Sequence, residues 1–359
     1  MKTRNLFLAI LILLIAIFLL MEGLRDLNVF KEARPKEEAR AKVDIMVEPG
    51  DSLVKVAKKL KEGGVISNEK VFVLFGELKG ADKKIQAGEY ELDPEMRSKD
   101  VLKILTEGRQ KYYRFLAPDG FNIWDISKEV DKMWPGSGPR FLLLCKDKTF
   151  INSLGVSADS LEGYLYPDTY FLRRFDTLEI LLKRMIGKFN RSWTPEYEQR
   201  AIELGYTRHQ IITIASIIEK EAGRRDEKPV VAAVIYNRLK KKMPLCMDPT
   251  VIYGLLPNFN GNLTKSELAG YNPYNTYQVS GLPPGPICNP GDRAIRAALW
   301  PEKADYLYFV SKGDGSHFFS TRYADHAQAV NLYQRQPLSP EPGETSGGIL
   351  QDSGTVKEQ

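Results

Sequence analysis

Two glutamates, Glu219 and Glu221, close an apolar stretch that runs from Ile211 to Ile218 and could carry acid–base chemistry. On a helix, Glu219 has apolar Ala215 and Ile212 about one and two turns earlier, while Glu221 points to a different face. Apolar neighbours raise the pKa of a glutamate above its usual value of about 4.3. A general acid needs such a raised pKa near neutral pH. The alternative is that both glutamates lie at a frayed helix end and have no catalytic role.

The segment that must position these acids, residues 208–224, has the periodicity of a helix. His209, Thr213, Ser216 and Lys220 would form one polar stripe, and Ile211, Ile214, Ala215, Ile218 and Ala222 would cover the opposite side. Because isoleucine also favours strands, a strand over 210–218 is the alternative.

Two further segments have the composition of a sugar site. Residues 161–170, LEGYLYPDTY, interleave acids with aromatic rings, which stack on pyranose faces while carboxylates bind hydroxyls. A strand with an aromatic face is the alternative for this segment. Residues 271–291 form a loop rich in Asn, Pro, Gly and Tyr, and a loop of that length in a compact domain is usually functional.

The composition argues against several other classes of protein. A net charge of +5, spread over interleaved acids and bases, is too mild and mixed to indicate nucleic-acid binding. Three cysteines, Cys145, Cys246 and Cys288, exclude a dense disulfide framework, and leave either one bridge or three free thiols. The three histidines are too scattered for a zinc site, so we expect no metal and no cofactor.

The N-terminus predicts membrane attachment. Leu6–Met21 is an unbroken apolar run preceded by Lys2 and Arg4. Without an A-x-A-like cleavage site after it, we expect an uncleaved signal anchor rather than a signal peptide. The positive charges keep the N-terminus in the cytoplasm and place the remaining chain outside.

We predict an α+β protein with one N-terminal transmembrane helix, a small LysM-like α+β module and a larger α+β catalytic domain. The expected division is a cytoplasmic tip and anchor over 1–25, a charged linker over 26–42, the LysM-like module over 43–110, the catalytic domain over 111–335 and a disordered tail over 336–359. In this module 43–47 alternates like a strand, Ser52 can cap a helix, and Leu53, Val56, Ala57 and Leu60 would form the buried face of that helix. The P-G-D-S-L turn at 49–53 carries the likeness to LysM, and glycan contact or simple scaffolding would suit this module equally. In the catalytic domain, the turn residues 312–316 between two strand-like segments predict a hairpin over 306–320.

Several long motifs in order resemble the endolytic murein transglycosylase family, YceG-like bacterial enzymes that are membrane-anchored lytic transglycosylases. The matching stretches are 161–170, 215–223, 231–239, 248–255, 274–291 and 305–330, and the likeness extends over about residues 1–335. It implies that the first acid of the E-K-E triplet, Glu219, is catalytic. Because Glu221 points to a different helix face, we interpret it as structural. Substrate-binding roles are implied for Glu162, Asp248, Asn275, Tyr277 and Gln278. Cys246 and Cys288 depart from the residues expected in their motifs.

The resemblance implies cleavage of the β-1,4 bond between N-acetylmuramic acid and N-acetylglucosamine in nascent peptidoglycan, with 1,6-anhydro ends and termination of strand elongation. It also implies peptidoglycan synthases (penicillin-binding proteins) as partners and a single-pass location in the bacterial inner (cytoplasmic) membrane, with the catalytic domain on the periplasmic side. Two alternatives are a non-catalytic wall-binding or assembly protein, and a water-using muramidase with Glu162 as its second carboxylate.

Overall fold

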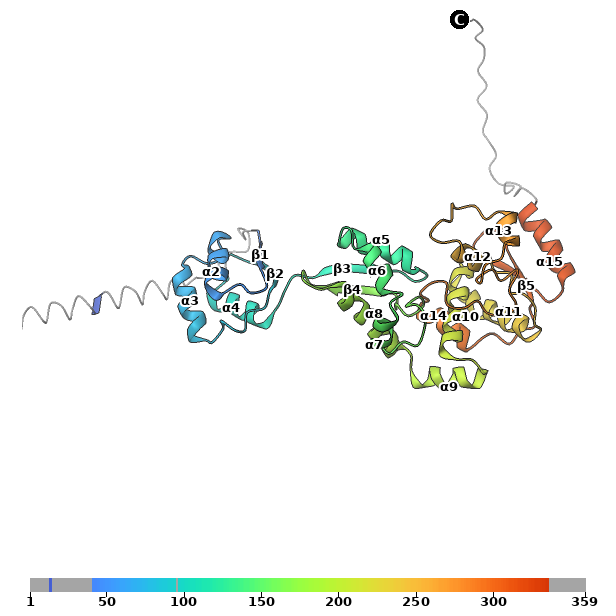
Figure 1. Ribbon diagram of the computed structural model, residues 1–359, viewed down its shortest axis with the longest axis horizontal. Helices are drawn as coiled ribbons and strands as arrows, with labels where there is room; N and C mark the ends of the chain where they lie inside the picture. The colour runs from blue at the N-terminus through green and yellow to red at the C-terminus, as the bar shows by residue number, and fades with distance from the viewer. Residues whose placement is uncertain (1–12, 15–40, 95, 336–359) are drawn as a thin grey trace, which may run out of the picture. The chain divides into compact units, whose positions relative to one another are not determined.

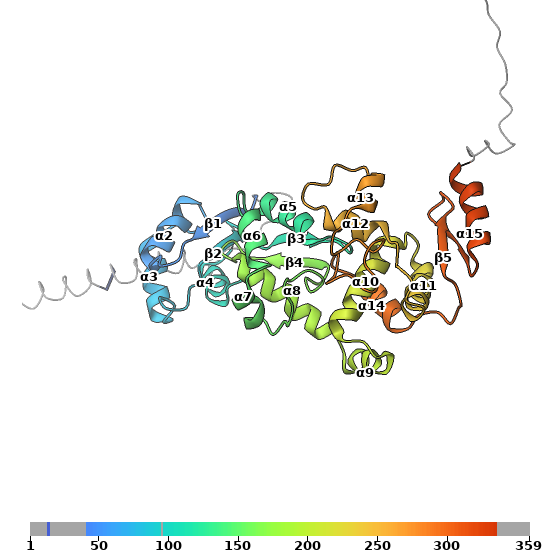
Figure 2. The same ribbon diagram turned by 45° about the vertical axis from the view of Figure 1, so that its right-hand side comes forward.

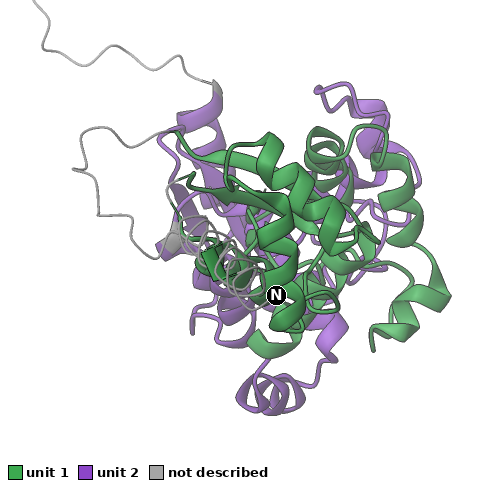
Figure 3. Cartoon of the chain, turned by 90° about the vertical axis from the view of Figure 1, so that its left-hand side faces the viewer, with its two compact units in different colours: residues 1–192 green, residues 193–359 purple. Residues whose placement is uncertain are grey.

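The computed structural model describes residues 13–14, 41–94 and 96–335. The chain divides into two compact units, residues 1–192 and residues 193–359 (Figure 3). Helices and three two-stranded antiparallel sheets make up the described residues, which confirms the predicted α+β class. The predicted domain boundaries are a finer division than these two units and stay a prediction.

The N-terminal part of the first unit follows the predicted strand, turn and helix order closely. Its elements are β1 (Val43–Val47), α2 (Leu53–Glu62), α3 (Glu69–Leu78), β2 (Gly88–Leu92) and α4 (Ser98–Glu107). β1 and β2 pair antiparallel, with Val43 opposite Leu92 and Val47 opposite Gly88. The Ser52 hydroxyl accepts a hydrogen bond from the Lys55 amide and so caps α2, as the turn chemistry predicted. The likeness to a LysM-like module stays a prediction.

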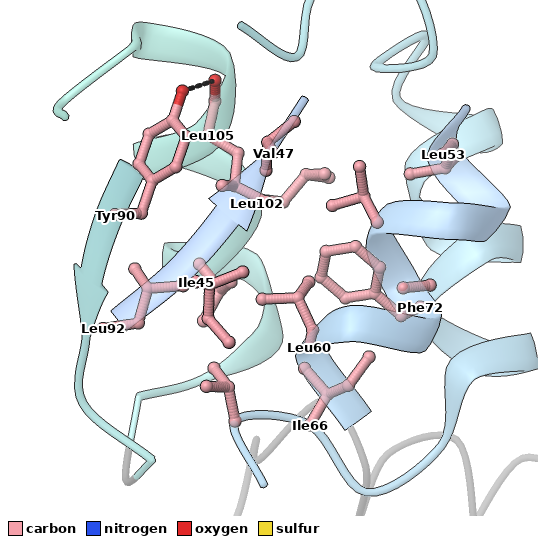
Figure 4. Close-up of a cluster of buried hydrophobic side chains, with 14 of the residues drawn as sticks. Ile45, Val47, Leu53, Leu60, Ile66, Phe72, Tyr90, Leu92, Leu102 and Leu105 are labelled. Carbon is pink, nitrogen blue, oxygen red and sulfur yellow. Dashed lines mark hydrogen bonds between the residues drawn. The ribbon is translucent and has the colours of Figure 1, made fainter. Parts of the chain in front are cut away.

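One apolar core holds this part together (Figure 4). The buried face of α2 consists of Leu53, Val56, Ala57 and Leu60, the four residues that the helical periodicity predicted. They pack with Ile45 and Val47 of β1, Phe72 of α3, Tyr90 and Leu92 of β2, and Leu102 and Leu105 of α4. The Tyr90 hydroxyl donates to the Gln86 carbonyl at 2.6 Å and also lies 3.4 Å from the Leu105 carbonyl, so the largest ring in this core keeps a polar partner.

The rest of the first unit is a two-stranded ribbon with helices between its strands. Its elements are β3 (Tyr113–Ala117), α5 (Ile123–Met133), α6 (Gly138–Leu144), α7 (Lys148–Ser153), β4 (Asp168–Leu172) and α8 (Leu178–Ser192). β3 and β4 pair antiparallel, with Tyr113 opposite Leu172 and Ala117 opposite Asp168. The motif over 161–170 therefore runs into β4, and the strand alternative applies only to its last three residues.

The second unit is mainly helical and carries the segment with the two glutamates. Its elements are α9 (Pro195–Leu204), α10 (Arg208–Glu221), the 3-10 helix η2 (Arg225–Glu227), α11 (Lys228–Lys240), α12 (Asp248–Gly254), α13 (Lys265–Ala269), α14 (Asp292–Leu299), β5 (Tyr308–Ser311), β6 (His317–Ser320), α15 (Tyr323–Val330) and the π-helix η3 (Asn331–Arg335). The predicted hairpin at residues 306–320 is present as β5 and β6, paired antiparallel.

The predicted anchor, Leu6–Met21, lies outside the described residues apart from positions 13 and 14, and so do the linker up to residue 40 and the tail from 336. Among the helices that the structure does describe, none is long and apolar enough to cross a bilayer.

Leu60→Ala tests the core of the N-terminal part. Leu60 is fully buried, so the substitution leaves a cavity and should lower the free energy of unfolding by about 3 kcal/mol. The matched control is Leu78→Ala at the end of α3, where the side chain is 77% exposed and the cost should stay below about 0.5 kcal/mol. Urea titrations followed by circular dichroism measure both. Equal losses of unfolding free energy at positions 60 and 78 would contradict the burial of Leu60 in this core.

Candidate active site

α10 is the central helix of the second unit, beside α11 and α14 in both views of the ribbon (Figures 1 and 2). Thr207 caps it in a capping box with Gln210, which decides the helix-or-strand alternative in favour of the helix. Every residue from Ile211 to Ile218 is buried. A helix that is buried all round needs neighbours on every side, so its polar residues must bind protein rather than solvent.

The polar stripe predicted for α10 is therefore not a solvated face. Thr213 and Ser216 are 1% and 0% exposed, because the loop over 284–291 lies along this side of the helix. The His209 ring Nε2 contacts the Pro284 carbonyl at 3.1 Å, and the Ser216 hydroxyl accepts from the Ile287 amide at 3.0 Å. The Cys288 thiol donates to the Ser216 carbonyl at 3.3 Å. These contacts hold the loop to the helix.

Glu219 provides the last contact in this series. Its Oε2 accepts from the Gly291 amide at 3.1 Å, and its Oε1 accepts from the Lys228 ammonium at 2.8 Å. The Lys228 side chain is 8% exposed and that of Glu219 is 12% exposed, so this is a nearly buried ion pair between α10 and α11. Both carboxylate oxygens are engaged within the protein. This is the arrangement of a structural carboxylate that ties two helices and a loop together.

Glu221, the last residue of α10, faces a different environment. Two residues along a helix differ by about 200° in direction, so Glu221 points away from the 284–291 loop. It lines a pocket of about 430 Å³. Burial, and then the negative charge of Asp248, raise the pKa of its carboxyl group to about 8. A glutamate with that pKa is protonated at neutral pH and can donate its proton.

Asp248 and Tyr277 face the same pocket, as their motifs predicted. The Tyr277 hydroxyl donates to Asp248 Oδ1 at 2.6 Å, which links the first residue of α12 to the loop over 271–291. Burial, followed by this hydrogen bond, raises the pKa of Tyr277 above its usual range, so the phenol stays a donor. The pocket therefore holds a protonated carboxyl, a second carboxylate and a phenol, a set suited to binding and cleaving a sugar chain.

Asn275 and Gln278 lie outside this pocket lining. Asn275 is fully buried: its amide donates to the carbonyls of Glu267, Leu268 and Gly270, and its oxygen accepts from the Tyr277 amide at 3.0 Å. These bonds use its polar atoms to shape the loop. Gln278 is exposed and donates to the Leu268 carbonyl at 3.2 Å. Their predicted contacts with substrate are not supported by this geometry, which gives Asn275 the role of positioning Tyr277.

Glu162 belongs to the first unit and is 2% exposed. Its Oε2 accepts from the Ile123 amide at 3.0 Å, at the first turn of α5. A carboxylate in that position satisfies a free amide and complements the positive end of the helix dipole. The geometry thus favours a structural role over the predicted contact with substrate.

The pocket is also lined by Arg238, His317 and His326. The sequence alone leaves the two histidines equally open to packing and to contact with a ligand. Arg238 donates to the carbonyls of Leu307, Pro244 and Leu245, and so joins α11 to the β5 hairpin. His317 Nδ1 lies 2.7 Å from Glu227 Oε2. His326 stacks on Tyr308, and burial together with the charge of Arg238 lowers its pKa. No spacing in the sequence relates these three positions, because only the fold of the hairpin and α15 brings them to the pocket.

The three cysteines are free thiols, which settles the alternatives left open by their odd number. Cys145 and Cys288 are buried, and Cys246 is partly exposed in the pocket lining. Within the described ranges, no group of three or more His, Cys, Asp or Glu side chains is arranged to hold a metal ion.

Residues 45–332, most of the chain, match the YceG-like family. The chain belongs to this family. The resemblance predicted from the sequence motifs is thus confirmed.

Two relatives and one crystal structure illustrate the extent of the YceG-like match. The endolytic murein transglycosylase of Bacillus subtilis (strain 168) is 35% identical over 314 residues, 83% of this chain and 86% of its own. A protein of the same name from Streptococcus pneumoniae (serotype 2, strain D39) is 27% identical, and its match covers 83% of this chain but 59% of that longer relative. The crystal structure of a yceG-like protein from Listeria monocytogenes matches with a TM-score of 0.57 and 30% identity, over 80% of this chain and 98% of that one.

The YceG-like motifs of the second unit converge on α10. The loop over 274–291 is bound to α10 at one end, through Ser216 and Glu219. Its other end is bound just before α12, where the Thr276 hydroxyl accepts from the Met247 amide at 2.9 Å and the Cys246 amide donates to the Thr276 carbonyl at 3.1 Å. The loop therefore connects the helix that carries Glu221 with the helix that carries Asp248.

Lys228→Met tests the structural role of Glu219. Removing the ammonium leaves a nearly buried carboxylate unpaired, and should lower the free energy of unfolding by about 3 kcal/mol. Combining Lys228→Met with Glu219→Gln removes the unpaired charge and should recover part of the lost free energy of unfolding. Lys240→Met, at an exposed position of the same helix, is the matched control and should cost less than about 0.5 kcal/mol. Denaturant titration of the four proteins measures this, and no recovery in the double variant would contradict the pairing.

Proposed function

We propose that this YceG-like chain is a peptidoglycan lytic transglycosylase of the endolytic kind, with Glu221 as its acid. The relatives named endolytic murein transglycosylase support the enzyme class. One observation supports the choice of acid: Glu221 lines the pocket with a pKa of about 8, beside Asp248 and Tyr277. Glu219, the acid predicted from the motif, is bound on both oxygens.

The reaction needs one carboxyl group that first donates and then accepts a proton. Protonated Glu221 gives its proton to the glycosidic oxygen between N-acetylmuramic acid and N-acetylglucosamine, and the bond from that oxygen to C1 breaks. The Glu221 carboxylate then accepts the proton of the muramyl C6 hydroxyl, whose oxygen attacks C1 and closes a 1,6-anhydro ring. The acid ends as it began, and no water is consumed.

Asp248 has a different part in this scheme. Its negative charge contributes to keeping Glu221 protonated before cleavage, and the same charge stabilises positive charge that develops at C1 in the transition state. The hydrogen bond from Tyr277 fixes the position of the Asp248 carboxylate. Two carboxyl groups in one pocket also favour a second candidate function, a muramidase in which Asp248, rather than the predicted Glu162, activates water or acts as nucleophile.

Glu221→Gln and Glu219→Gln are the decisive pair of variants. Both keep the size of the side chain and remove its titratable proton. Glu221→Gln should reduce cleavage of purified glycan strands by about 10²–10⁴-fold, the usual contribution of a general acid–base group. Glu219→Gln should lose stability, because its one amide oxygen can accept from only one of the two donors, Lys228 and Gly291. The folded variant should keep most of the activity, since Glu219 is not among the residues that line the pocket. If Glu219→Gln alone abolishes cleavage in a folded protein, the acid is Glu219 as the motif predicted.

Two readouts of the same digests complete this test. The wild-type rate should fall as the pH rises through about 8, because the carboxyl group that must donate the proton is then ionised. Mass spectrometry of the products should show 1,6-anhydro-muramyl ends. Reducing muramyl ends would support the water-using alternative instead, and an activity that rises through pH 8 would rule out Glu221 as the acid.

Anchoring and location form a second part of the proposal, supported by the apolar run of the sequence alone. Leu6–Met21 holds the chain in the cytoplasmic membrane with the enzyme on the outer side, where nascent strands are made. Cleavage there ends strand elongation, and peptidoglycan synthases are the partners that this role implies.

The anchor is tested on membranes from cells that make the full chain. Mass spectrometry of the membrane-bound protein should find an N-terminal peptide from before residue 21, because an uncleaved anchor is retained. A chain that lacks residues 1–25 is the control and should leave the membrane fraction. A mature protein that starts after about residue 20 would show that the run is a cleaved signal peptide.

A further inference from the structure

A second pocket lies in the first unit, where β4 packs beside α8 (Figure 1). Its volume is about 460 Å³. The lining consists of Asp168, Thr169, Tyr170 and Phe171 from β4 and Ile180, Lys183, Arg184, Lys188 and Arg191 from α8. All of these residues belong to one unit, and none of them takes part in the proposed cleavage chemistry.

Four cations from two turns of α8 line this pocket, and only two of them are neutralised. Lys188 pairs with Asp168, and Arg184 pairs with Asp176 at 2.7 Å while donating to the Phe171 carbonyl at 2.6 Å. These two cations attach α8 to β4. The other two, Lys183 and Arg191, are exposed and have no carboxylate within ion-pair distance among the described residues.

Lys183 and Arg191 lie on one stripe of the helix, two turns apart, with Gly187 between them. A methyl group at Gly187 would make only an ordinary contact, 3.5 Å from Arg191 Nη1, so the fold would accept alanine there. Glycine weakens a helix interior relative to alanine. The sequence thus places two unneutralised cations on one face of α8 with no side chain between them, which leaves room for an anion between the two.

An apolar surface borders this positive pocket. Phe171 lines it and is 59% exposed, and Leu116 on the neighbouring strand is 45% exposed. Thr169 is opposite Leu116 and Phe171 is opposite Arg114, so these side chains share the outer face of the ribbon. Exposed Phe and Leu beside unneutralised Lys and Arg match a ligand that has an anionic group and an apolar chain.

We propose that this pocket binds a phosphate or diphosphate group that carries an apolar chain. Arginine and lysine are the side chains that bind phosphate oxygens most strongly, and two unpaired cations suit a group with two or more negative charges better than a single carboxylate. Phe171, Ile180 and Leu116 supply the surface for the first part of the chain. The ligand is either a polyprenyl diphosphate or an anionic phospholipid, since the two share this chemistry.

The test measures binding to the purified full chain in non-ionic detergent, with geranyl diphosphate as the probe and calorimetry as the readout. Wild type should bind it, and Lys183→Gln with Arg191→Gln should bind at least tenfold more weakly. Lys61→Gln with Lys99→Gln is the matched control, because it removes two exposed lysines of the same unit that line neither pocket. The control should bind like wild type.

A second variant separates the two parts of the ligand. Phe171→Ser changes an exposed residue and should weaken geranyl diphosphate binding while leaving inorganic pyrophosphate binding unchanged. Competition by phosphatidylglycerol dissolved in the same detergent micelles identifies a phospholipid as the source of the group, and its absence identifies a diphosphate of the polyprenyl type. The proposal fails if the Lys183/Arg191 variant binds as tightly as the control, if no binding occurs, or if succinate competes as well as pyrophosphate. Because no glycan is cleaved in this experiment, its result is independent of the acid assigned to the reaction.

Discussion

The burial of residues 211–218 in α10 is the constraint on which the second unit depends. Eight consecutive residues without solvent contact require neighbours on all sides, and each polar group among them must find a partner inside the protein. Ser216 meets this requirement by binding the 284–291 loop. Glu219, just after the buried residues, binds the same loop and Lys228 of α11. The loop in turn extends to Thr276 and the start of α12. The pocket around Glu221 is the place where these parts meet.

Much of the fold could be predicted because the local signals agree with one another. The buried face of α2, the Ser52 cap and the pairing of β5 with β6 follow from periodicity, capping and turn chemistry. The capping box at Thr207 and Gln210 specifies the start of α10 even though its isoleucines also suit a strand. The periodic pattern identifies the polar stripe of α10, but nothing in such a pattern shows that the stripe binds a distant loop.

The sequence alone does not distinguish the catalytic acid between the two glutamates of α10. Ala215 and Ile212 precede Glu219 on its face of the helix, and Ile217 and Ile218 lie one turn before Glu221. The sequence therefore predicts an apolar environment for either glutamate. What distinguishes them is tertiary: Lys228 and Gly291 reach Glu219, and Asp248 approaches Glu221. Among the predicted substrate residues, Asp248 and Tyr277 do line the pocket, whereas Asn275 and Glu162 are buried, which no spacing could show.

The position of Glu221 as the last residue of α10 has an electrostatic consequence. The peptide dipoles of a helix sum to a partial negative charge at its C-terminus, where the last carbonyl groups are unpaired. A carboxylate in the final turn is disfavoured by that field, while a neutral carboxyl group is not. Burial and Asp248 therefore act in the same direction as the backbone of α10 itself. The helix that carries the acid to the pocket also helps to keep the proton on it.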